Sequence, residues 1–532
     1  MMTAQPRSAA PLDDLTARLP NLAITTDDLS LYGTDVYYGA EHLPAALVRP
    51  WDETDVVKLV QAARELGFSL NMRGGGLSYS AGYLAKNDHS LLVDLSAMTE
   101  IIELNLTDRF VTVQPGVTWS ALRDALRPHG MTTPFWGTFS GLHATIGGSV
   151  SQGAKFYGSA SRGGSAESVL GLRVVTGRAE ILTTGSASAT GRASPFFRNY
   201  GPDLTGMFLG DCGAFGIKTA ITLQLIPTAK EEAYASFSFD DPAAQMGAMA
   251  QIGAELLASE CSGIDPFTAR TRMASQGFLS DLKTIGQVVT EANSLTHGLR
   301  DAALIGLSGR RFANKIGYLM NTIVEGQDRH EANRKIKRVR QIAKDAGGRA
   351  VPASVPRVMR KIPFPPMNSL LTPSGKRMAW LHTVVPNSRG GEAFTRTEAV
   401  FTRMKDELKQ HGIAHGYLLS THGPTAVGVE TLIRWPDAPL PLHLHFMSDA
   451  EQAALKRRDD NPAARAVLKR LSNEILADWK DLGGVHVQIG QKYPYFETRQ
   501  PEVQTLLRQL KALHDPDGIM SPGNLFELRD DH

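Results

Sequence analysis

A strand-like run that leads directly into three glycines is the part of this sequence best suited to bind an anion. Residues 69–73 end in Arg73, residues 74–76 are all glycine, and Ser78 follows. Glycine allows positive φ angles and close backbone approach, so consecutive amide groups can surround phosphate oxygens, while Arg73 and Ser78 add side-chain donors. The pattern predicts a loop that holds a diphosphate-containing cofactor, and an ordinary glycine-rich turn is the alternative.

Two further glycine clusters follow the first. Residues 145–158 contain the second, and residues 210–217 contain the third. Apolar strand-like runs come after them, at 169–175 and 219–226. The first loop follows a strand but does not open a helix, so a Rossmann dinucleotide fold is excluded and another phosphate-binding architecture is required.

Hydrophobic periodicity predicts the elements that position the first loop. A short strand at 47–50 precedes a helix that Asp52 starts and Gly67 ends. Strands are expected near 91–95 and 109–114, and a turn at 115–117 leads to a helix whose buried stripe is Trp119, Leu122 and Leu126. Strands and helices mixed in this way indicate an α+β fold.

The second half of the chain predicts an antiparallel sheet covered by helices. Strand-like runs lie at 235–239, 316–324, 378–385 and 413–421, with helices between them. They are followed by a long helix over 464–479, a strand at 485–489, a helix from Pro501 and a turn at 515–524. A sheet of this kind suits a lid or substrate-binding domain.

Composition and charge exclude several classes of protein. The 532 residues carry a formal charge of +2 that is spread along the chain, so we expect no nucleic-acid partner. The basic run at 334–340 has its apolar residues at helical spacing and predicts a solvated helix face. Two cysteines argue against a disulfide scaffold and fit a reducing cytoplasm, and neither a signal peptide nor a membrane-spanning segment is expected.

Taken together, these motifs resemble those of a known flavoprotein family, typified by vanillyl-alcohol oxidase, D-lactate dehydrogenase and the glycolate oxidase flavin subunit. Residues 73–80 resemble the pyrophosphate loop of that family, and residues 113–117 its Q-P-G-V turn. Residues 146–158 resemble its flavin-flanking segment, 201–217 its D-L-T-x-L-F-x-G-x-x-G-x-x-G-I signature, and 515–524 its closing D-P-x-G-x-x-x-P-G segment.

The resemblance implies FAD as cofactor and a definite architecture. The expected fold is α+β, with a PCMH-type (p-cresol-methylhydroxylase-type) FAD-binding domain of two α/β subdomains plus a cap domain of antiparallel sheet and helices. The expected division is a leader at 1–39, the FAD-binding domain at 40–230, the cap at 231–484 and a returning segment at 485–532. The residues expected to bind FAD are Arg73, Gly74, Gly75, Gly76, Leu77, Ser78, Pro115, Gly116, Val117, Gly147, Gly148, Ser149, Gly153, Tyr157, Gly158, Gly213, Gly216, Ile217 and Asn524.

The sequence departs from some relatives at the position where they attach the flavin covalently. Those relatives have a histidine just after the glycines of the first loop, and this chain has Leu77, which offers no nucleophile. We therefore predict non-covalent FAD. His486 is a second candidate for such a bond, with a plain active-site or structural role as the alternative.

Relatives in this family oxidise an alcohol carbon by passing hydride to flavin while a base takes the hydroxyl proton. Histidine suits that proton transfer, because its ordinary pKa lies near neutrality. The candidates in the second half of the chain are His382, His415, His422, His443, His445 and His486. We select His486, because residues 484–495 alternate like a strand that would place His486 and Gln488 on one face and bring Tyr493 to its end.

A second group of candidate residues lies at 429–445. Arg434 could grip a substrate carboxylate in bidentate fashion, and the surrounding stretch resembles an E-P-x-x-x-W segment that lines the pocket in the family. His443 and His445, predicted two apart on one strand face, are further candidates. The H-x-G-D-G-N-x-H pattern of metal-dependent relatives is absent, so no metal is expected.

The leading functional hypothesis is an FAD-dependent oxidase or dehydrogenase that oxidises the CH–OH group of a small 2-hydroxy acid of the D-lactate or glycolate type. A para-substituted phenolic alcohol is the alternative, which Tyr493 and Tyr495 keep open. A non-redox alkylglycerone-phosphate synthase is disfavoured, since its histidine run is missing, and a flavin module without turnover is a third class. The electron acceptor is left open between oxygen, quinone and cytochrome, and so is assembly as a homodimer.

Overall fold

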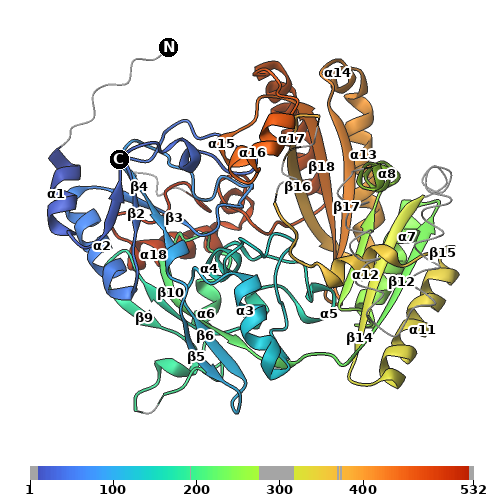
Figure 1. Ribbon diagram of the computed structural model, residues 1–532, viewed down its shortest axis with the longest axis horizontal. Coiled ribbons are helices and arrows are strands. Elements are labelled where there is room, and N and C mark those ends of the chain that lie inside the picture. The colour runs from blue at the N-terminus through green and yellow to red at the C-terminus, as the bar shows by residue number, and fades with distance from the viewer. Residues whose placement is uncertain (1–9, 192, 275–316, 368–370, 372–373, 527–532) are drawn as a thin grey trace.

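The protein is described by a computed structural model over residues 10–191, 193–274, 317–367, 371 and 374–526 (Figure 1). It is an α+β protein with two smaller sheets built from strands within residues 23–224 and a larger antiparallel sheet built from residues 231–436. The first nine residues of the predicted leader, and Ile316 of a predicted strand, lie outside the described residues. The predicted domain borders at 40, 231 and 485 stay predictions.

The first sheet carries the glycine loop at the end of an edge strand. Its strand order is β1 (Ala23–Thr25), β2 (Ala46–Arg49), β4 (Ser90–Asp94) and β3 (Ser69–Arg73), and only the β1–β2 pair is antiparallel. Helix α2 (Glu53–Leu66) connects β2 to β3. Asp52 caps its first turn, and Gly67 ends it in the left-handed region at φ 72°. Apart from β1, which lies in the predicted leader, these elements agree with the sequence-based predictions.

Replacing Asp52 tests whether its side chain stabilises the start of α2, as the sequence predicts. The Asp52 carboxylate accepts a hydrogen bond from the Asp55 amide at 2.9 Å. Asp52→Ala should lower the stability of the unfolding unit that contains α2 by about 1 kcal/mol, whereas Asp52→Asn should retain it, because Asn caps helices as well as Asp does. Urea unfolding midpoints measure the difference, and equal midpoints for the two variants would contradict the capping role.

The second sheet is antiparallel and flanks the other two glycine clusters. Its order is β5 (Ile101–Asn105), β6 (Phe110–Val113), β10 (Ile217–Gln224), β8 (Val169–Val175) and β9 (Ile181–Thr183). Helices α3 (Trp119–Leu126) and α4 (Ile146–Gln152) precede β8. The glycines of the second cluster therefore begin a helix, which the sequence analysis did not assign; Thr145 caps it by accepting from the Gly148 amide.

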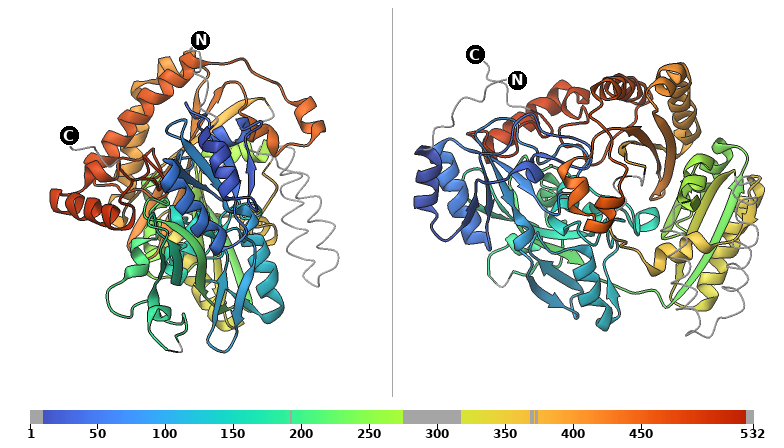
Figure 2. Two further views of the ribbon diagram at one scale, coloured as in Figure 1. Left: turned by 90° about the vertical axis from the view of Figure 1, so that its left-hand side faces the viewer. Right: turned by 45° about the horizontal axis from the view of Figure 1, so that its top comes forward.

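The third sheet has seven antiparallel strands, and four of the longer helices lie on the same face. Its order is β15 (Arg349–Val351), β12 (Glu231–Phe239), β14 (Tyr318–Gly326), β13 (Glu260–Ile264), β17 (Ala414–His422), β18 (Ala426–Pro436) and β16 (Lys376–Pro386). Helices α7 (Pro242–Ala254), α11 (Arg329–Asp345), α13 (Gly390–Arg403) and α17 (Pro462–Asp481) pack on one face and form the largest core (Figure 2). The basic run lies on α11, which buries Ile336 and Val339 as predicted.

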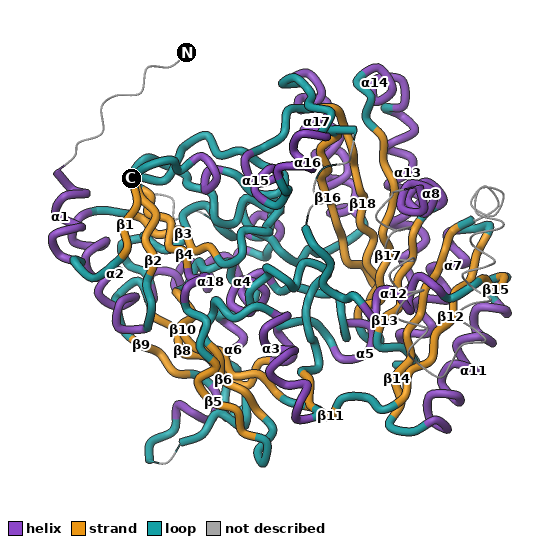
Figure 3. The backbone as a smooth tube through the Cα atoms, in the orientation of Figure 1, coloured by secondary structure: helices purple, strands orange, loops and turns teal. Residues whose placement is uncertain are grey.

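Short elements and loops fill the region between the two halves of the molecule (Figure 3). Strands β7 (Met131–Thr132) and β11 (Ile226–Pro227) form a small pair. Besides α3 and α4, the short helices of the described chain are α1 (Ala10–Arg18), α5 (Ser159–Arg162), α6 (Leu204–Met207), α8 (Pro266–Ala274), α12 (Ser354–Lys361), α14 (Lys405–Gln410), α15 (Pro441–His445) and α16 (Asp449–Ala454). None of the described helices has the length and apolar character that crossing a bilayer requires.

The end of the chain returns to the first sheet. After helix α18 (Pro501–His514), the Leu70 amide donates to the Ile519 carbonyl at 2.7 Å, and the Ser521 amide donates back to Leu70 at 2.8 Å. The predicted strand at 485–489 is wrong. Val485 makes one isolated bridge to Val384, and the chain then turns, with Gln488 at φ 53°.

Candidate active site

The first glycine loop packs so closely on the second cluster that two of its glycines have no room for a side chain. A Cβ on Gly74 would lie 2.2 Å from Thr145 Oγ1, and one on Gly75 would lie 2.0 Å from the backbone oxygen of His143. Gly76 has φ 73°, in the left-handed region. Close packing at Gly74 and Gly75 and the positive φ of Gly76 explain why glycine stands at all three positions.

The 115–117 turn and the start of α4 form one backbone unit. The Gly147 amide donates to the Pro115 carbonyl at 2.9 Å, and the Ile146 amide donates to Val117 at 2.8 Å. A Cβ on Gly147 would lie 2.5 Å from Pro115 Cβ, and one on Gly116 would lie 2.3 Å from the Leu95 oxygen. The unit brings Gly148 and Ser149 to the first turn of α4.

The third cluster joins the second and the chain terminus. The Gly210 amide donates to Val150, and the Cys212 amide donates to Ser151. The Asn524 side chain donates to the carbonyls of Gly82 and Cys212 at 2.8 and 2.7 Å. Gly213 and Gly216, which precede Ile217 at the start of β10, both have positive φ angles. The structure therefore brings all three glycine clusters together.

The second cluster ends in a buried aromatic turn. Gly153 ends α4 in the left-handed region, and Tyr157 stacks on Trp136 with ring centroids 4.2 Å apart. Gly158 has φ 86°, and a Cβ there would lie 2.1 Å from the Pro134 oxygen. Leu77 and Ser78, on the loop after β3, are partly buried.

Unsatisfied polar atoms around the first loop indicate a missing partner. Arg73 is only 8% exposed, and its Nε has no hydrogen-bond partner among the residues that the structure describes. The same holds for Oδ1 of Asn71 and of Asn524. Buried polar atoms are nearly always hydrogen-bonded in complete proteins. A buried guanidinium beside a glycine backbone loop fits the diphosphate of FAD, and the amide oxygens fit its donors.

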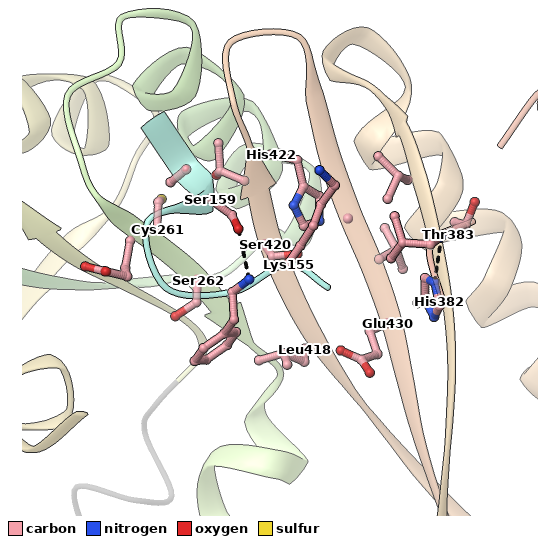
Figure 4. A pocket seen from close by; sticks show the side chains of 18 of the residues that line it. Lys155, Ser159, Cys261, Ser262, His382, Thr383, Leu418, Ser420, His422 and Glu430 are labelled. Atoms are coloured by element: carbon pink, nitrogen blue, oxygen red, sulfur yellow. Dashed lines mark hydrogen bonds between the residues drawn. The ribbon is translucent and has the colours of Figure 1, made fainter. Parts of the chain in front are cut away.

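A cavity of about 80 Å³ lies between the second glycine cluster and the face of the large sheet opposite α7, α11, α13 and α17. This volume is the space open to the centres of water-sized spheres, and one water needs roughly 10–15 Å³ of it. The cavity can therefore hold several waters or a small substrate. Figure 4 shows Lys155 reaching toward His422, with Glu430 and His382 on neighbouring strands. The polar side chains that line the cavity are Tyr79, Lys155, Ser159, Glu260, Ser262, His382, Thr383, Ser420, Thr421, His422, Glu430 and Gln488.

His422 is the cavity histidine with an unused ring nitrogen. Its Nε2 lies 3.0 Å from the Ser420 hydroxyl, and its buried Nδ1 has no partner among the described residues. Burial lowers the pKa of His422 to about 3, and the nearby Lys155 ammonium adds to the effect. The ring is therefore neutral near pH 7 and can accept a proton.

His382 uses both ring nitrogens within the protein. The Val487 amide donates to its Nε2 at 3.1 Å, so the proton of the neutral ring lies on Nδ1, 2.9 Å from the Tyr493 hydroxyl. That hydroxyl also accepts from the His382 amide at 3.1 Å. Burial, together with His486, lowers the pKa of His382 to about 3. These bonds hold His382 as a neutral wall of the cavity.

His486 lies behind that wall. Its Nδ1 is 2.7 Å from the His382 carbonyl, and its ring stacks on Tyr493 with centroids 4.4 Å apart. Burial lowers the pKa of His486 to about 4. Val487 and Gln488 line the cavity, whereas His486 and Tyr493 are not among its described lining residues. Their catalytic roles stay predictions.

Arg434 and His443 lie away from the cavity lining. Arg434 is four residues beyond Glu430 on β18, roughly 13 Å along the strand, with its guanidinium over the Phe267 ring at 6.0 Å. His443 accepts from the Leu440 amide and contacts the Val36 carbonyl at 2.8 Å.

The prediction that His443 and His445 share a strand face is wrong, because both lie on helix α15, where residues two apart point in different directions. Among the described residues, no group of three or more His, Cys, Asp or Glu side chains is arranged to hold a metal.

Comparison with protein families supports the same cofactor. Residues 44–185 match the family model described as FAD binding domain, and residues 487–525 match that of FAD linked oxidases, C-terminal domain. The chain thus contains an FAD binding domain and the C-terminal domain of FAD linked oxidases. The first match contains the first two glycine clusters and the 115–117 turn between them. The second contains the returning segment with Asn524.

Individual relatives of this flavoprotein match over limited segments. It is 34% identical to D-2-hydroxyglutarate dehydrogenase of Haemophilus influenzae over 186 residues, which is 34% of this chain and 17% of that protein. It is 27% identical to the mitochondrial cytochrome-dependent D-lactate dehydrogenase of Arabidopsis thaliana over 207 residues, 38% of this chain and 35% of that protein. The matched segments are thus about a third or less of these relatives' lengths.

A solved structure shows the same fold over nearly the whole chain. It is 4-ethylphenol oxidase from Gulosibacter chungangensis, in complex with isoeugenol. The TM-score is 0.74, with 17% sequence identity and 99% coverage of both chains. p-Cresol methylhydroxylase with bound substrate has the same fold, with a TM-score of 0.73, 17% sequence identity and coverage of 100% of this chain and 99% of that chain. These similarities confirm the PCMH-type fold that the flavoprotein's sequence implied.

Sequence reasoning missed several residues that line the cavity. His422 was one candidate among six, Glu430 had no assigned role, and Lys155 was passed over although it lies within the second glycine cluster. The position of Lys155 was the available signal, since a cation within a segment that resembles the flavin-flanking part of the family suits an anionic substrate. Glu430 and His422 required the strand pairing to be known.

Proposed function

We propose that this flavoprotein is an FAD-dependent oxidoreductase that oxidises the CH–OH group of a small 2-hydroxy acid. The observation that carries the proposal is that His422 and Lys155 line the same cavity, beside the segment that resembles the flavin-flanking part of the family. A neutral histidine and a primary ammonium are the two groups that a hydroxy acid needs, one for its hydroxyl proton and one for its carboxylate.

In this proposal His422 is the general base. Its Nδ1 accepts the hydroxyl proton while the substrate carbon loses hydride and becomes a carbonyl carbon. When bound, FAD supplies the acceptor for that hydride. Ser420, 3.0 Å from Nε2, keeps the ring oriented and shares the positive charge that forms on it.

Lys155 is proposed to hold the substrate carboxylate. Its ammonium lies 3.6 Å from Glu167, whose side chain is half exposed, so this ion pair is weak. A substrate carboxylate bound in the cavity can therefore compete with Glu167 for the lysine. Relatives that match this chain are named for D-2-hydroxyglutarate and D-lactate, which are both 2-hydroxy acids. These names support the substrate class, and the individual acid is left open.

The surroundings of the cofactor support further parts of the proposal. Leu77, at the position after the loop glycines, supports non-covalent FAD. The two described cysteines, Cys212 and Cys261, are buried and unpaired, which supports a reducing compartment such as the cytoplasm. Oxygen, quinone and cytochrome stay open as acceptors.

A phenolic alcohol is the second candidate substrate. Tyr79 lines the cavity near Glu430, and burial together with that carboxylate raises the pKa of the Tyr79 hydroxyl well above its usual value. Tyr79 therefore stays protonated and can donate to a phenolate oxygen. The fold similarity to a 4-ethylphenol oxidase permits this candidate but does not favour it over a hydroxy acid.

Anaerobic titration of the purified holoprotein tests the proposal. We expect D- or L-2-hydroxy acids to bleach the oxidised-flavin bands. Lys155→Met should raise the half-saturating concentration of the acid by about 10-fold or more, as loss of a charge-assisted contact predicts. Bleaching by para-substituted phenolic alcohols alone would replace the first candidate by the second. A yellow protein inert to both groups would contradict the proposed function.

A further inference from the structure

A carboxylate of the large sheet reaches across to the backbone of the second glycine cluster. Glu260, the first residue of β13, is 7% exposed and lines the cavity. Its Oε1 accepts from the Gly158 amide at 3.2 Å, and its Oε2 accepts from the Ser259 hydroxyl at 2.5 Å. Glu260 thus comes from the large sheet and contacts the backbone of the second glycine cluster.

The segment that Glu260 contacts forms one wall of the cavity. Lys155, Phe156 and Ser159 line it, and Gly158 lies between them with φ 86°. The Tyr157 hydroxyl donates to the Pro363 carbonyl at 2.8 Å. Since the segment is irregular apart from one short helical turn, its position depends on such contacts from outside.

A buried charge cluster holds Glu260 in place. The Arg360 guanidinium lies 3.0 Å from Glu260, 2.8 Å from Glu325 and 3.1 Å from Glu232. Arg162 forms a second ion pair with Glu325 at 2.6 Å. Burial raises the pKa of Glu260, and Arg360 opposes that rise. Arg360 therefore favours the ionised form of Glu260, and its ion pair helps to hold that side chain beside Gly158.

Arg360 also reaches the wall through an aromatic side chain. Its guanidinium lies over the Trp136 ring at 5.1 Å, and Trp136 stacks on Tyr157. Glu260, through the Gly158 amide, and Arg360, through Trp136, thus both support residues 157 and 158.

We propose that Glu260 is a positioning residue, which fixes the 155–159 wall through the Gly158 amide and so directs Lys155 into the cavity. This inference rests on the proposed function for the role of Lys155. Glu260 acts through the wall and takes no part in the transfer of hydride or proton.

Hydrogen exchange of the holoprotein, followed by mass spectrometry, tests the contact without any substrate. Glu260→Ala should speed exchange in a peptide spanning residues 155–162 by about 10-fold, as loss of one buried hydrogen bond predicts. Glu260→Gln should exchange close to the wild-type rate, because its amide oxygen still accepts from Gly158. Glu232→Ala is the matched control, since Glu232 contacts Arg360 but has no described bond to the wall.

Steady-state kinetics with a reactive 2-hydroxy acid test the consequence. Glu260→Ala should raise KM about 10-fold with the limiting rate of flavin reduction within about 3-fold of wild type, and Glu260→Gln should rescue KM. Unchanged exchange in Glu260→Ala, equal changes in Glu232→Ala, or faster exchange with an unchanged KM would each overturn the inference. A wild-type protein that no hydroxy acid reduces would contradict the proposed function alone, because the exchange measurement uses no substrate.

Discussion

Replacing His422 by Asn should lower the rate of flavin reduction by about 10²- to 10⁴-fold, the usual contribution of a general base. Asn has a similar size but accepts no proton at neutral pH, so substrate binding and FAD content should change little. Stopped-flow reduction under anaerobic conditions measures the rate. His415→Asn is the matched control, because His415 lies on the same strand but stacks on Phe401 outside the cavity lining.

The pH dependence gives an independent check on this assignment. The pKa of His422 is lowered to about 3, so the base is already unprotonated well below neutrality. The rate of flavin reduction should stay flat between about pH 5 and 8 and fall only as the pH approaches 3. A rate that falls through pH 6.5 in wild type and not in His422→Asn would place a solvated histidine at the site and contradict the burial argument.

Features set by neighbouring residues could be predicted from the sequence. Helix α2 follows from its apolar stripe, its Asp52 cap and its Gly67 terminus, which all act within a few residues of one another. The glycine loop after β3 was predictable for the same reason. Even so, the cause of Gly75 is contact with His143, almost seventy residues later, which no local pattern contains.

The segment after α17 shows where local patterns fail. Residues 485–489 alternate as a strand does, but their amides find other partners, since the Gln488 amide donates to the Gln152 carbonyl and the Val487 amide donates to His382 Nε2. Long-range bonds therefore turn the chain where alternation predicted extension. As a result His486 packs on Tyr493, and the cavity receives Val487 and Gln488 in its place.

The cavity itself depends on pairing that sequence does not reveal. His382 lies opposite Glu430 across the β16–β18 ladder, and Ser420 lies opposite Gly428 across the β17–β18 ladder. Alternation along each strand then directs His422, Glu430 and His382 to the face opposite α7, α11, α13 and α17. Candidate histidines were visible in the sequence, and their selection required the register.

Replacing Gly75 by Ala should weaken FAD binding by about 10- to 100-fold. A Cβ there would lie 2.0 Å from the backbone oxygen of His143 and 2.8 Å from its carbonyl carbon, so the loop must move away from the second cluster. Overpacking of this kind costs about 1–3 kcal/mol, which corresponds to that loss if the loop contacts the diphosphate. Quenching of FAD fluorescence on titration of apoprotein measures the dissociation constant.

Gly247→Ala is the matched control for this prediction. Gly247 lies in the middle of α7 and is exposed to solvent. A Cβ added there would meet no atom within 4 Å. The substitution should leave FAD affinity unchanged and stabilise the protein by up to about 1 kcal/mol, because alanine is the better helix former. If Gly75→Ala bound FAD as tightly as Gly247→Ala does, the loop after β3 would not be the diphosphate site, and the buried Arg73 Nε would need another partner.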